Sequence, residues 1–180
     1  TNIFLILSGS SIAMMESETL NQSAPLFGRR TGQILVDPLN FSQSRQFFPE
    51  KNFCDFLNIY TITGGMPAYL KQFEGGGEMA EEIKKNIFIK TAFLYNEVEF
   101  TLKEELRETK NYLAILRAIA LGKRKLSEIV NEVGLDKATA NKYLSVLINL
   151  RLVEREVPVT EDNPEKSRRG LYKISDNFFV

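Results

Sequence analysis

The chain has 180 residues, of which 43% are hydrophobic, and its 23 basic and 23 acidic side chains give a formal net charge of zero. This length and apolar content exclude a disordered chain and allow one large domain or two small ones. The sequence has no histidine and one cysteine, Cys54, which excludes Ser-His-Asp and Cys-His nucleophile systems and an ordinary zinc site.

The first residues contain a short apolar run, Ile3–Leu7, followed by a Ser-Gly-Ser-Ser turn. Such a run predicts a strand buried on both faces of a parallel sheet. A second strand is predicted at 32–39, with a helix and an arginine-containing loop, "PLFGRRTG", between the two. Two strands cannot form a doubly wound sheet, so we expect that the chain is a piece of a larger protein. The unpaired edge of the first strand should make the chain self-associate or swap this segment, or leave the segment poorly ordered.

From residue 42 the pattern becomes helical. Helices are predicted in "SQSRQFF", in "NFCDFLNIYTIT" up to Gly64-Gly65, and in "PAYLKQFE", which begins at Pro67. Two further helices are predicted at about 78–91 and 94–107, and the acidic residues of the second are expected to form a solvated face.

The last third predicts three helices and two strands. The helices lie in "YLAILRAIALG", "LSEIVNEVGL" and "KATANKYLSVLINLRL", with a glycine turn between the second and the third. The strands "LVEREVPV" and "GLYKIS" follow, joined by a polar loop. This order is typical of a winged helix-turn-helix.

The winged helix suggests contact with duplex DNA. The exposed side of its third helix carries Lys137, Thr139, Asn141 and Lys142, and the wing adds Arg168 and Arg169. Residues 1–108 contain 10 basic and 14 acidic residues and residues 109–180 contain 13 and 9, so the halves carry about −4 and +4. The third helix is only modestly basic, and a winged helix that packs against protein remains an equal alternative.

The order of these motifs resembles a known family. "LILSGSSIAMME", "PLFGRRTGQI", "TGGMPAYL" and "VPVTEDNPEKSRRGLYKISDNFF" are similar to segments of the prokaryotic ATPases of the archaeal-type AAA+/STAND group. These proteins have a P-loop domain, a helical lid, a winged helix and often a nuclease-like C-terminal domain. The resemblance implies a mainly α fold with minor β: residues 1–50 as the C-terminal remnant of the P-loop α/β core, 51–108 as the helical lid, and 109–180 as the winged helix.

The resemblance also implies roles for individual residues. Ser8 or Ser10 would occupy the sensor position that reads the γ-phosphate, and Arg29 or Arg30 would act as arginine finger or sensor on the transition-state charge. Gly64, Gly65 and Pro67 match a Gly-x-Pro motif that lies against the nucleotide and couples it to the lid and the winged helix.

The chain departs from this family in two respects: it has no G-x-x-x-x-G-K-[ST] sequence and no acidic strand end for Mg²⁺. We therefore expect ATP and Mg²⁺ to be bound only by a longer parent, with the missing N-terminal P-loop half and C-terminal domain as partners. The chain alone is expected neither to hydrolyse ATP nor to bind it tightly.

A single cysteine and an initial apolar run too short for a bilayer favour a cytoplasmic protein without a membrane role. The alternatives are a stand-alone winged-helix DNA-binding transcriptional regulator and an interaction scaffold.

Overall fold

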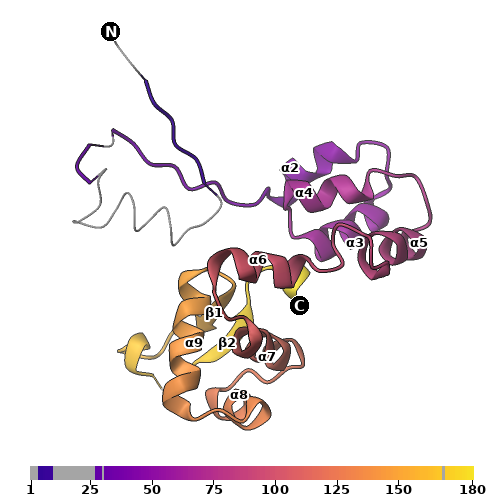
Figure 1. The fold of residues 1–180 in the computed structure, drawn as a ribbon. Coiled ribbons are helices and arrows are strands. Elements are labelled where there is room, and N and C mark those ends of the chain that lie inside the picture. The colour runs from indigo at the N-terminus through magenta and orange to yellow at the C-terminus, as the bar shows by residue number, and fades with distance from the viewer. Residues whose placement is uncertain (1–3, 10–26, 30, 168) are drawn as a thin grey trace.

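The computed structural model describes residues 4–9, 27–29, 31–167 and 169–180. Its described part is mainly helical with one small two-stranded sheet, as the sequence predicts. The helices form two groups, α2–α5 and α6–α9, and the sheet belongs to the second (Figure 1).

The N-terminal group consists of short helices, and asparagines cap the starts of two of them, α2 and α3. Asn40 forms a capping box with Gln43 before the first helix, and the Asn52 side chain accepts a hydrogen bond from the backbone N–H of Asp55 at 2.9 Å. The elements are α2 (Phe41–Ser44) with a 3-10 turn (Arg45–Phe47), α3 (Phe53–Thr63), α4 (Pro67–Leu70) with a 3-10 turn (Lys71–Phe73), and α5 (Met79–Ile83), which continues as a π-helical turn (Lys84–Phe88).

Aromatic side chains dominate the interior of this group. The Phe41 ring lies 4.8 Å from that of Phe56 and 5.2 Å from that of Tyr60, between centroids. Such tilted and edge-on pairs stabilise a small core beyond the area that they bury. The N-terminal core consists of Phe48, Phe56, Ile59, Tyr69, Leu70, Phe73 and Leu94.

The C-terminal group contains four helices and a hairpin: α6 (Glu97–Glu105), α7 (Lys110–Ala120), α8 (Leu126–Val133), α9 (Lys137–Asn149), β1 (Val153–Glu156) and β2 (Leu171–Ile174). Gly134 ends α8 with a left-handed backbone, φ +73°, as its place in the sequence predicts. The strands pair antiparallel, with Val153 opposite Ile174 and Glu156 opposite Leu171. The C-terminal core is aliphatic and lies among these elements; its buried members include Leu102, Ile115, Leu116, Ile129, Leu144, Leu147 and Val153.

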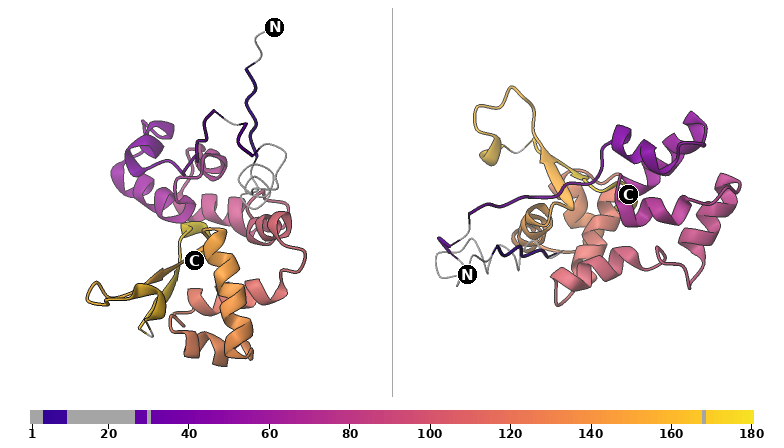
Figure 2. Two further views of the ribbon diagram at one scale, coloured as in Figure 1. Left: turned by 90° about the vertical axis from the view of Figure 1, so that its left-hand side faces the viewer. Right: turned by 90° about the horizontal axis from the view of Figure 1, so that it is seen from above.

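The end of the chain lies between the two groups. After β2 a 3-10 turn, Asn177–Phe179, brings the C-terminus back toward α3 and α4 (Figure 2). Phe179 is buried in the C-terminal core, whereas Phe178 packs against both cores. The two groups are therefore joined by apolar packing as well as by the backbone between α5 and α6.

The two strands predicted near the start are not strands in this structure. Residues 4–9 and 31–39 belong to no helix or strand, and their apolar side chains Phe4, Ile6, Ile34 and Val36 are exposed. The reason is the absence of a neighbour: within the described residues, only β1 and β2 pair. Figure 1 shows both segments running outside the helical groups.

No helix in the described part of the chain is long and apolar enough to cross a membrane.

Candidate functional site

The turn between α3 and α4, residues 64–66, is the most constrained part of the N-terminal group. Gly64 caps α3 in a left-handed conformation, φ +60°, and its N–H donates to the Tyr60 carbonyl at 2.9 Å. Gly65 also has a positive φ, +85°, and Pro67 is the first residue of α4. Two successive left-handed residues favour glycine at both positions, and proline sets the backbone angle at the start of the next helix.

The turn contacts the incoming segment before α2. The backbone N–H of Leu39 donates to the carbonyl of Gly65 at 2.9 Å. A Cβ atom at position 65 would lie 1.9 Å from the Leu39 carbonyl oxygen, a distance that no structure tolerates. Position 65 therefore needs glycine both for its backbone angle and for this close approach.

The other side of the turn contacts the C-terminal segment. A Cβ atom at Gly64 would lie 3.3 Å from Cβ of Asn177. The glycine turn thus lies between the segment that precedes the helices and the segment that follows the hairpin. Three parts of the chain that are far apart in sequence meet at two glycines.

A second set of contacts next to the turn involves Tyr69 of α4. Its ring lies 4.9 Å from that of Phe178, and its hydroxyl donates to Glu97 Oε1 of α6 at 3.0 Å. Burial, together with the charge of Glu97, raises the pKa of the Tyr69 phenol, so the hydroxyl stays a donor. Asp176 accepts from the N–H of Phe178 at 2.8 Å, and burial raises the pKa of its carboxyl group.

Two of the candidate phosphate-sensing residues, Ser8 and Arg29, are not assembled with this turn. Ser8 and Arg29 are exposed, and the structure gives neither side chain a hydrogen bond or ion pair to another described residue. Ser10 and Arg30 lie outside the described residues. Their proposed roles therefore remain predictions.

The candidate DNA-contacting residues of α9 lie at its N-terminal end. Asp136 caps the helix by accepting from the backbone N–H groups of Ala138 and Thr139 at 2.9 and 3.0 Å. Hydrogen bonds from the side chain and backbone of Thr139 lower the pKa of Asp136, so a negative charge stays at this end. Lys137, Asn141 and Lys142 are exposed, whereas Thr139 is half-buried. Lys137, Asn141 and Lys142 can therefore contact another molecule. The Asp136 carboxylate at the same end of the helix would repel a phosphate group.

The loop between β1 and β2 is held by Arg155, a residue that the sequence analysis did not single out. Its guanidinium donates to the carbonyl of Pro164 at 3.0 Å and to that of Ser167. Arg169 is exposed and pairs with Glu161 at 3.4 Å, and Arg168 lies outside the described residues. The alternating charges in "VERE" give no signal that its arginine turns back onto the loop.

Within the described residues, no group of three or more His, Cys, Asp or Glu side chains could hold a metal ion. The structure does show a groove between α7 and α8, lined by residues to which the sequence analysis gave no role.

Comparison with known proteins gives two matches. Residues 55–175 match a family described as "Domain of unknown function (DUF8612)". The whole chain is 38% identical, over 180 residues, to "Uncharacterized protein MJECL04" of Methanocaldococcus jannaschii, and it spans 40% of the length of that relative. No solved structure matches the chain.

Proposed function

Because the chain belongs to the DUF8612 family, whose match runs from α3 through β2, we propose that residues 51–108 and 109–180 act together, as the lid and the winged helix of a STAND-like AAA+ ATPase switch. In this proposal residues 1–50 complete the nucleotide-binding core of a longer protein. ATP and Mg²⁺ are held by the part of that protein that carries the phosphate loop. Ser8 or Ser10 and Arg29 or Arg30 add the contacts to the γ-phosphate.

The glycine turn carries this proposal. Gly65 touches Leu39, in the segment assigned to the core, and Gly64 touches Asn177, at the end of the segment assigned to the winged helix. The backbones of Gly65 and Leu39 are in direct contact, and Asn177 packs on Gly64 through its own Cβ, so a shift of Leu39 must displace the turn, and with it the contact to Asn177. This is the arrangement that a switch needs between a nucleotide site and an output domain.

The order of elements in the C-terminal group supports its assignment as a winged helix. Helices α7, α8 and α9 precede an antiparallel hairpin, with a glycine turn between α8 and α9. In such domains the helix in the position of α9 is the recognition helix, which contacts the bound molecule, and the hairpin forms the wing. The Arg155 contacts give the wing loop a defined shape.

The exposed segments at 4–7 and 34–36 support a sheet that is completed elsewhere. Phe4, Leu5, Ile6 and Leu7 are 84, 72, 77 and 52% exposed, and Ile34 and Val36 are 87 and 86% exposed. Apolar stretches of this composition are normally buried on both faces of a parallel sheet. The relative is much longer than this chain, which leaves room for the remaining strands.

The proposal is tested in two proteins. Isothermal titration with ATP and Mg²⁺ should show no tight binding to this chain, whereas the longer Methanocaldococcus jannaschii relative should bind and hydrolyse ATP. In the relative, nucleotide should also change hydrogen exchange in the segment equivalent to Asn177–Phe179. A relative that neither binds nor hydrolyses ATP would overturn the ATPase proposal.

A second candidate function is a stand-alone DNA-binding regulator, which the exposed Lys137, Asn141 and Lys142 and the charge of the second half favour. It predicts that this chain binds duplex DNA with an affinity that falls as salt rises. Lys142→Glu should weaken that binding, and Lys90→Glu, an exposed lysine of the N-terminal group, is the matched control. Absence of binding at low salt would exclude this function, and absence of both DNA and nucleotide effects would favour a scaffold.

A further inference from the structure

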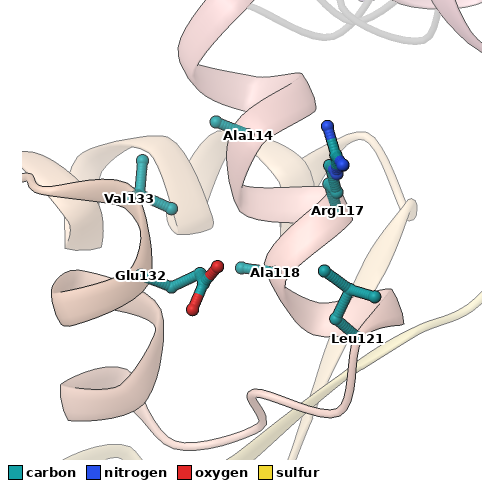
Figure 3. A pocket seen from close by; sticks show the side chains of 6 residues that line it. All are labelled: Ala114, Arg117, Ala118, Leu121, Glu132 and Val133. Atoms are coloured by element: carbon teal, nitrogen blue, oxygen red, sulfur yellow. The ribbon is translucent and has the colours of Figure 1, made fainter.

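The groove between α7 and α8 has a volume of about 270 Å³ and is lined by side chains of both helices (Figure 3). From α7 and its end come Ala114, Arg117, Ala118 and Leu121, at the spacing of one helix face, and from α8 come Glu132 and Val133. None of the candidate nucleotide or DNA contacts belongs to this set. The groove is therefore a separate surface of the C-terminal group.

The groove combines a projecting side chain with a recess. Leu121 is 63% exposed, although α7 buries most of its other leucine and isoleucine side chains. Next to it Ala118 is only 1% exposed, and Ala114 and Val133 are half-buried, so the floor is apolar and made of small residues. One leucine side chain from another molecule would fit this recess.

The two charged residues of the groove have opposite signs. Arg117 and Glu132 are both exposed, and the structure forms no ion pair between them or from either to another described residue. In Figure 3 the Glu132 carboxylate reaches from α8 toward α7, whereas the Arg117 guanidinium points away from it. Each charge is thus available to a group of opposite sign on a second molecule.

We propose that a second copy of this chain occupies the groove, in a twofold-symmetric dimer. In an isologous interface the same patch meets itself, so residue i of one copy contacts residue j of the other, and the reverse. This patch carries both halves of each required pair: Leu121 and its apolar recess, and Arg117 and Glu132. Leu121 of each copy fills the recess of the other, and Arg117 of each copy pairs with Glu132 of the other.

Other occupants fit the groove less well. Small-molecule sites are usually larger and enclose most of their ligand, whereas this recess is open and its charged groups are exposed. A nucleic-acid backbone would be repelled by Glu132. Because the patch is small, the dimer should be weak and concentration-dependent. None of Lys137, Asn141 and Lys142 of α9 lines the groove.

Sedimentation velocity over a concentration series tests the dimer through charge reversal. Arg117→Glu should place two like-charge pairs in the interface and weaken association about tenfold or more, and Glu132→Arg should do the same. An equimolar mixture of the two single variants should regain association, because each cross pair is then attractive. Lys90→Glu, a reversal away from the groove, should leave association unchanged. Leu121→Asp should abolish it, and far-ultraviolet circular dichroism should show that each variant is folded.

Each outcome decides the proposal. Loss in both single variants and recovery in the mixture would support it, because folding defects or general charge effects do not recover on mixing. A chain that stays monomeric at high micromolar concentration would overturn it. An oligomer unaffected by Arg117→Glu and Glu132→Arg would also overturn it, and would indicate association through another surface, such as residues 4–7. None of these readouts depends on ATP or DNA.

Discussion

The ring of Tyr69, in the N-terminal group, lies 4.9 Å from the ring of Phe178, near the end of the chain. The Tyr69 hydroxyl also donates to Glu97 of α6, so one side chain of the N-terminal group contacts both the first helix of the C-terminal group and the end of the chain. Phe178 in turn packs against both cores. This pair gives the two helix groups a shared apolar contact, and their stabilities should be linked through it.

Phe178→Ala should uncouple the two groups. Because Phe178 is only half-buried, we expect a loss of about 2 kcal/mol, below the usual cost for a fully buried phenylalanine. Thermal unfolding should change from one transition to two, since each core then unfolds without the other. Phe88→Ala is the control: Phe88 is 68% exposed, and its removal should change stability by less than about 0.5 kcal/mol. One unchanged transition in Phe178→Ala would show that the groups are coupled elsewhere.

Gly65→Ala should be far more destabilising than Gly122→Ala. The two glycines have nearly the same φ, +85° and +86°, so both substitutions incur the left-handed strain of roughly 1 kcal/mol. Only at position 65 would the new methyl group overlap the Leu39 carbonyl oxygen; no atom lies within 4 Å at position 122. We expect a total loss of about 3 kcal/mol or more at Gly65, since the backbone must move. Urea denaturation measures the difference, and equal losses would contradict the close approach.

The sequence predicts the helices from Phe53 onward because each has a local signal. The predicted stops at Gly64 and Gly134 are left-handed helix caps in the structure. In the last helix Ala140, Leu144 and Leu147 recur at helical spacing, and all three are buried. Such features depend on residues three or four positions apart, which periodicity detects.

Contacts between distant segments have no such signal. Gly64 and Gly65 belong to a coupling motif only through the family resemblance, and nothing in "SDNFF" predicts that Asn177 and Phe178 return to the glycine turn. The apolar run at 3–7 indicates a buried strand, but it does not indicate which strand would pair with it. Without a pairing strand, residues 4–7 form no strand in this structure. Local sequence thus predicts which residues are suited to a buried position, whereas the residues that pack against them depend on the rest of the fold.

Asp176→Asn should change the pH dependence of stability. Burial raises the folded-state pKa of Asp176 above its ordinary value of 3.8, so the unfolded chain gives up this proton at lower pH than the folded chain. The contribution of the protonated carboxyl group is thus complete below pH 3.8 and is lost as pH rises through the raised pKa. Asparagine can still accept the hydrogen bond from the Phe178 N–H but does not titrate.

Urea denaturation from pH 3 to pH 7 measures this effect as a difference between the two proteins. The stability of Asp176→Asn relative to the natural chain should rise with pH above 3.8 and then become constant, because the other carboxyl groups cancel in the difference. A difference that stays constant over the whole range would show that Asp176 has the same pKa in both states.

Arg155→Ala should loosen the loop between β1 and β2. The substitution removes the donors to the Pro164 and Ser167 carbonyls, and we expect amide exchange in residues 160–167 to become roughly tenfold faster. Arg169→Ala is the control, because its exposed pair with Glu161 contributes little.

Gly170 offers a second test of the Arg155 contacts. A Cβ atom at Gly170 would lie 2.4 Å from Nε of Arg155, so Gly170→Ala should destabilise the natural chain but cost much less beside Arg155→Ala. Additive losses in the double variant would contradict the contact between Arg155 and position 170.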